Sequence, residues 1–170
     1  MSLAERLGYG PQDRLLILNC DDVGSSHAAN QACLEAMRSG AASSGTLMVP
    51  CPWAREAVDM FEGLDLGVHL TLTAEYPGYR WRSLTGAASL HDADGFMPSS
   101  AAEVSARATP DDVRAECRAQ IEQALAWGVD VTHLDSHMGA NQIDPRFFAI
   151  YVELAAEFDL PLRMLGPDLE

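Results

Sequence analysis

Stretches that favour β-strands alternate with stretches that favour α-helices along most of this chain of 170 residues. Short apolar runs predict the strands, and longer segments with apolar residues on one helical face predict the helices. The expected strands are 14–19, 44–50, 65–73, 130–136 and 160–165, and the expected helices are 27–40, 52–63, 109–128 and 144–159. Because repeated strand–helix alternation requires parallel strands joined by helical crossovers, we expect an α/β protein. Either a doubly wound sheet or a (β/α) barrel fits this pattern.

Length predicts a single domain that spans residues 1–170. One segment does not follow the alternation: residues 74–110 are polar and contain several Gly and Pro residues. Ordinary connections between elements have about 4 to 6 residues, so this segment is expected to be a long insertion loop.

The charge balance is strongly acidic, with 25 acidic against 11 basic residues and a net charge of -14. Binding to nucleic acid or to an anionic membrane needs clustered basic residues, so neither is expected as a partner. No apolar stretch approaches the roughly 20 residues of a membrane span, and the first residues do not have the order of a signal peptide. A cytoplasmic location is therefore expected.

Acidic and histidine side chains recur where the expected strands end, and the carboxyl ends of parallel strands meet at one edge of the fold. These residues are Asp21, Asp22, His69, His133, Asp135 and His137. Two imidazoles with one carboxylate form a recurring set of ligands for a divalent metal. One of the adjacent aspartates could bind the ion while the other acts as a base, and His133 and Asp135 could support the ligands by hydrogen bonding. The alternative interpretations are that the aspartates cap the next helix and that His69 and His133 are structural.

Five segments in chain order add a family resemblance that covers about residues 14–165. They are "LLILNCDDVGSS", "SSGTLMV", "LGVHLTLT", "LHDADGFM" and "VTHLDSHMGA". Together they resemble the YdjC-like carbohydrate deacetylase family, which includes chitooligosaccharide deacetylases. The resemblance implies a deformed (β/α) barrel of the polysaccharide-deacetylase-like type. Because members of that family are commonly longer, the barrel is expected here to be incomplete, with about five β/α units.

The resemblance also implies an activity: metal-dependent removal of the acetyl group from N-acetylated sugars or oligosaccharides. Asp22, His69 and His137 match the metal ligands of the family, and Asp21 matches the catalytic base. Arg163 lies where related deacetylases place an arginine that contacts the base. The implied cofactor is one divalent metal ion, Mg²⁺ or Zn²⁺, which would polarise the acetyl carbonyl and lower the pKa of a bound water.

The sequence gives a weaker indication of the residues that bind the substrate. Tyr76, Tyr79 and Trp81 lie in the long insertion and are expected to stack on sugar rings, although a loop packed by its own aromatics fits equally. Two other functions remain open: a non-catalytic metal- and sugar-binding module, and a metal-dependent phosphoesterase. The second needs basic residues around the site, yet the chain has no Lys and its Arg residues do not cluster near the motifs. An incomplete barrel would expose strand edges, so a homodimer is expected.

Overall fold

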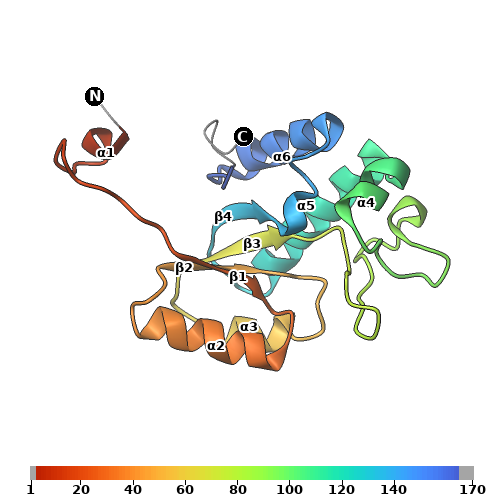
Figure 1. The fold of residues 1–170 in the computed structure, drawn as a ribbon, viewed down its shortest axis with the longest axis horizontal. Helices are drawn as coiled ribbons and strands as arrows, with labels where there is room; N and C mark the ends of the chain where they lie inside the picture. Colours follow the sequence, from red (N-terminus) through yellow and green to blue (C-terminus); the bar gives the residue numbers. More distant parts are fainter. Residues whose placement is uncertain (1–2, 165–170) are drawn as a thin grey trace.

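The computed structural model describes residues 3–164, most of which form a parallel sheet with helices packed around it, while the short first helix lies apart from the sheet (Figure 1). The strands are β1 (Asn19–Val23), β2 (Ser44–Leu47), β3 (Leu66–Leu70) and β4 (Val131–Ser136). The α-helices are α1 (Leu3–Arg6), α2 (His27–Arg38), α3 (Ala54–Met60), α4 (Ala101–Arg107), α5 (Pro110–Ala126) and α6 (Pro145–Phe158). Two short 3₁₀ helices are η1 (Ala88–Leu90) and η2 (His137–Gly139).

The strands of the sheet lie in the order β1-β2-β3-β4, and every neighbouring pair is parallel. Consecutive strands of a (β/α) barrel are neighbours in this way, whereas a doubly wound sheet reverses its order at a switch point. The α/β fold class predicted from the sequence is confirmed. The parallel arrangement also brings the carboxyl ends of all four strands to one edge of the sheet.

β2 and β3 each end three residues before the expected position, and two other expected strands differ more strongly from the structure. The first strand begins at Asn19, and residues 15–18 are extended but exposed, so the prediction of a buried strand over 14–19 is wrong. Such an apolar run is typical of a strand with both faces covered, but residues 15–18 belong to no strand of the described sheet, and their side chains are exposed. As a result, Asp21 and Asp22 lie within β1 and not after it. The expected fifth strand is reduced to one parallel bridge between Leu134 and Leu162; the end of its predicted range, residue 165, lies outside the described residues.

Helix starts follow their local sequence signals. The side chains of Ser26, Thr109 and Asp144 each accept a hydrogen bond from a backbone N–H in the first turn of α2, α5 and α6, respectively. Pro occupies the first helical position of α5 and α6, where its missing N–H costs nothing. α2 and α3 lie together on one side of the sheet, while α5 packs against β3 and α6 against α5 (Figure 1).

The segment 74–110 is an ordered insertion that contains η1 and α4. It is anchored by Trp81, Leu90, Met97 and Val104, whose side chains are buried. Among the described residues, no helix combines the length and the apolar character needed to cross a membrane.

Candidate metal centre

A break in the regular geometry of β1 lets two adjacent aspartates serve one site. The register between β1 and β2 shifts between Cys20 and Val23, which is the mark of a β-bulge. Within the bulge Asp22 has a φ of 61°, in the left-handed region that Asp tolerates better than most residues. Because the backbone turns at this point, the usual alternation of side chains is broken, and the carboxylates of Asp21 and Asp22 both reach the carboxyl edge of the sheet.

The two histidines approach the same place from the neighbouring strands. His69 lies in β3 and pairs in register with Asp135 of β4, and its side chain is 4% exposed. His137 follows the last residue of β4 and opens η2, with its side chain 7% exposed. Met138 after it has a φ of 52°, so the chain turns sharply directly after the histidine.

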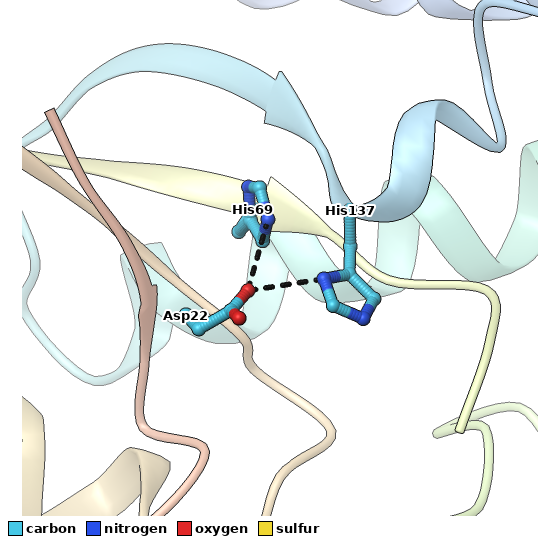
Figure 2. Close-up of side chains that lie close together, drawn as sticks. All are labelled: Asp22, His69 and His137. Atoms are coloured by element: carbon cyan, nitrogen blue, oxygen red, sulfur yellow. Dashed lines mark hydrogen bonds and ion pairs between the residues drawn. The ribbon is translucent and has the colours of Figure 1, made fainter. Parts of the chain in front are cut away.

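Asp22, His69 and His137 converge although they come from three separate elements (Figure 2). Oδ1 of Asp22 lies 3.3 Å from Nε2 of His69 and 3.0 Å from Nδ1 of His137. Bonds from these ligand types to Zn²⁺ are about 2.0 to 2.2 Å long, so neighbouring donors around one ion are roughly 3 to 3.5 Å apart. Both separations agree with that requirement, and one carboxylate with two imidazoles suits several divalent metals. The three residues therefore fit one divalent ion.

The electrostatics of the group favour a positive charge beside Asp22. Hydrogen bonds with the two imidazoles hold the pKa of Asp22 well below its ordinary value. Burial disfavours a charge on His137, but its hydrogen bonds with Asp22 and Glu75 outweigh burial and raise its pKa to about 9. Burial also opposes a charge on His69, yet hydrogen bonds with Asp135 and Asp22 leave its pKa above the ordinary value. Carboxylates thus surround both histidines, as a cation site requires.

A second group lies directly beside the first. Nη1 of Arg163 donates hydrogen bonds to Oδ1 of Asp21 at 2.6 Å and to Oδ2 of Asp135 at 2.8 Å. Burial opposes the charge of Asp135, but His69 and Arg163 together hold the pKa of Asp135 below its usual range. Asp21, His69 and Asp135 also offer donor atoms within 4.8 Å of one another. The guanidinium group already bridges the two carboxylates of that set, so a second cation there would meet an existing positive charge.

A cleft of about 360 Å³ opens over both groups. It is lined by the metal-site residues together with η2 and the segment after α6, and both Asp21 and Asp22 are about half exposed to it. A small polar substrate can therefore reach the carboxylates from solvent.

Glu75 is a member of this site that the sequence did not reveal. Both of its carboxylate oxygens lie 3.1 Å from Nε2 of His137, on the far side of the ring from Asp22. It follows the buried segment that continues β3, and only its position six residues after the "GVH" of that strand could have pointed to the site. A lone glutamate at the start of a polar insertion gives no recognisable signal.

The remaining predicted residues occupy different surroundings. His133 lies outside the metal site, with its Nδ1 3.8 Å from Oδ1 of Asp65. Its ring packs over Gly67, where a Cβ atom would come within 2.7 Å of it. Tyr76 and Tyr79 are 59% and 37% exposed. Trp81 is only 3% exposed, and its indole N–H donates to the carbonyl of Thr73, so it has almost no free face for a sugar.

Comparison with known proteins identifies the family of this chain. A family model described as YdjC-like protein matches residues 15–169, which is nearly the whole chain. The chain belongs to the YdjC-like family. It is 41% identical over 160 residues to a carbohydrate deacetylase from Thermus thermophilus and 31% identical over 160 residues to one from Thermoanaerobacter pseudethanolicus. These matches cover 94% and 92% of this chain.

The fold of this YdjC-like chain also resembles a solved structure. A crystal structure from Enterococcus faecalis, provisionally described as a cellobiose-phosphate cleavage protein, superimposes with a TM-score of 0.81 at 27% identity and covers 90% of this chain. The chain spans 56% and 63% of the length of the two curated relatives and 59% of the solved structure. The shared fold and family are therefore established over this length only.

Proposed function

We propose that this chain carries the metal site and catalytic base of a carbohydrate deacetylase, which removes the acetyl group from N-acetylated sugars or oligosaccharides. The observation that carries the proposal is the convergence of Asp22, His69 and His137 on one point, directly beside Asp21. The names of the relatives support the same chemistry, since several are carbohydrate deacetylases.

In this proposal Asp22, His69 and His137 hold one divalent ion, Mg²⁺ or Zn²⁺. When bound, the ion supplies Lewis-acid chemistry that polarises the acetyl carbonyl and acidifies water. The protein's part is to place the three donors, with both imidazoles buried and the carboxylate of Asp22 half exposed to the cleft.

Asp21 is the proposed base. Both hydrogen bonds recorded for its carboxylate, from Asn19 and from Arg163, end on Oδ1. They fix the orientation of the group and leave Oδ2 able to accept a proton from an attacking water. Arg163 is proposed to position this base, and Asp135 to hold the guanidinium in place from its buried side.

Tyr76 and Tyr79 remain the proposed sugar contacts, because they are exposed aromatic side chains in the segment that begins at Glu75. The hydroxyl of Tyr79 donates to the carbonyl of Ser25 at 2.7 Å, which ties the ring to the loop that follows β1. A sugar ring can stack on such a fixed aromatic face with little loss of side-chain entropy. Trp81 is better described as the buried support beneath Tyr79, since their rings lie 6.1 Å apart edge to face.

The test is release of acetate from N-acetylglucosamine oligomers with added Mg²⁺ or Zn²⁺. We expect Asp21→Asn and His137→Ala to lose at least about 100-fold in rate, the order expected for a missing base or metal ligand. His91→Ala is the matched control, because His91 bonds to Ser83 in the insertion and should leave the rate unchanged. Activity that survives both site substitutions would contradict the mechanism.

One alternative has a specific observation behind it. Asp22, His69 and His137 could hold an ion, and Tyr76 and Tyr79 could contact a sugar, without turnover. Binding of Zn²⁺ and of the oligomer without acetate release would favour this non-catalytic module. The phosphoesterase alternative loses support, since Arg163 occupies the place between Asp21 and Asp135 where a second metal would be needed.

A further inference from the structure

Each imidazole of the metal site lies between two carboxylates. Nδ1 of His137 is 3.0 Å from Oδ1 of Asp22, and its Nε2 is 3.1 Å from Glu75. For His69 the atoms are exchanged: Nε2 is 3.3 Å from Oδ1 of Asp22, and Nδ1 is 3.2 Å from Oδ2 of Asp135. The nitrogens that face Asp22 therefore differ between the two rings, as Figure 2 shows.

The outer carboxylates determine which nitrogen can bind an ion. A neutral imidazole carries one N–H, and a metal can bind only the nitrogen without it. An ionised carboxylate accepts hydrogen bonds and cannot donate them, so the N–H of each ring must face its outer carboxylate. Histidine ligands of metals commonly donate their second N–H in this way, which fixes both the tautomer and the orientation of the ring.

Glu75 is well placed for such a role. Its side chain is 20% exposed, and the hydroxyl of Thr73 donates a hydrogen bond to Oε1, so the carboxylate is held from its own segment. It meets the ring of His137 at the nitrogen opposite the one that faces Asp22. The groups of donor atoms that lie within 4.8 Å of one another in the described residues do not include Glu75. Glu75 thus lies outside the set of direct ligands.

We propose that Glu75 is a positioning residue: it holds His137 as the Nε2–H tautomer so that Nδ1 binds the metal, while Asp135 holds His69 in the opposite tautomer so that Nε2 binds. The proposal rests on the metal site of the proposed function. The two histidines present different nitrogens to Asp22 because their rings come from different directions. His69 projects from within β3, whereas His137 follows the end of β4.

The test combines Zn²⁺ affinity with the state of the histidine rings. Calorimetric titration with Zn²⁺ should give a loss of about 10- to 100-fold in affinity for Glu75→Ala, the usual effect of removing a partner of a metal-bound histidine. Glu75→Gln should lose less, because its amide oxygen can still accept from Nε2–H. Glu103→Gln, the same change on the exposed side of α4, should match the wild type.

Long-range ¹H–¹⁵N spectra of the Zn²⁺-loaded chain provide a readout that a merely structural role would not change. We expect the ring proton of His137 on Nε2 and that of His69 on Nδ1. A spectrum with Zn²⁺ on Nε2 of His137, or a Glu75→Ala variant that binds Zn²⁺ as tightly as the wild type, would overturn the role of Glu75. If the alanine variant does not fold, as judged by circular dichroism, Glu75→Gln carries the comparison.

The same titration separates this proposal from the proposed function. Wild-type chain that binds no Zn²⁺, or a His69→Ala variant that binds it as the wild type does, would overturn the metal site itself. Loss of binding in His69→Ala together with unchanged binding in Glu75→Ala would leave the metal site standing and overturn only the role of Glu75.

Discussion

Asp21 and Asp22 follow each other in the chain, and a regular strand would direct them to opposite faces of the sheet. The bulge in β1 and the left-handed backbone at Asp22 remove that conflict. Such a conformation costs roughly 1 to 2 kcal/mol for an ordinary L-residue, and Asn and Asp bear it more easily than Ala. Backbone strain of this kind is typical of functional positions.

A pair of substitutions separates the charge of Asp22 from its backbone. Both Asp22→Asn and Asp22→Ala remove the carboxylate, so both should abolish measurable Zn²⁺ binding in calorimetry. Since Asn tolerates the left-handed region, Asp22→Ala should be less stable than Asp22→Asn by about 1 kcal/mol in urea unfolding. An alanine variant as stable as the asparagine variant would contradict the argument from backbone strain.

Among the helices, α6 has the most strongly bonded start. The carboxylate of Asp144 accepts from the backbone N–H and the guanidinium of Arg146 and from the hydroxyl of Ser105 in α4. Its side chain is 7% exposed. The hydrogen bonds with Arg146 and Ser105 hold the pKa of Asp144 far below its ordinary value. The cap therefore joins α6 to the insertion as well as starting the helix.

We expect Asp144→Ala to lower the free energy of unfolding by about 1 to 2 kcal/mol at neutral pH, as the loss of a helix cap does. Because the native pKa is depressed, this contribution is present above about pH 4, the ordinary pKa of Asp, and declines as the pH falls below it. Urea unfolding at several pH values checks both points. Asp111→Ala, an exposed first-turn acid of α5, is the control and should change stability by less than about 0.5 kcal/mol.

At the level of elements, the sequence predicted those helix ends that depend only on neighbouring residues. The starts of α5 and α6 followed from a capping residue with Pro after it, at Thr109 and at Asp144. The bounds of β1 could not be predicted, because they depend on which residues β2 offers for pairing. Glu75 could not be predicted either, because its proposed role depends on a contact with His137, which is 62 residues away in the sequence.

At the scale of the whole molecule, an unpaired strand edge and exposed apolar side chains of the described chain lie together beside β1. Within the described residues β1 pairs only with β2, and its other edge has no strand partner. The extended segment before it carries four apolar side chains that are 47–76% exposed, Leu15, Leu16, Ile17 and Leu18. Unpaired strand edges with apolar side chains tend to associate with another chain.

We therefore predict that this chain forms a homodimer at micromolar concentration through the segment 15–18 and the edge of β1. Leu16→Lys combined with Ile17→Lys should shift it to a monomer, because two buried charges would oppose the contact. Size-exclusion chromatography with light scattering measures the mass of each form. Leu125→Lys is the matched control, since Leu125 is 45% exposed on α5, away from this edge. A wild-type chain that elutes as a clean monomer would contradict the prediction, and so would a double variant that stays dimeric.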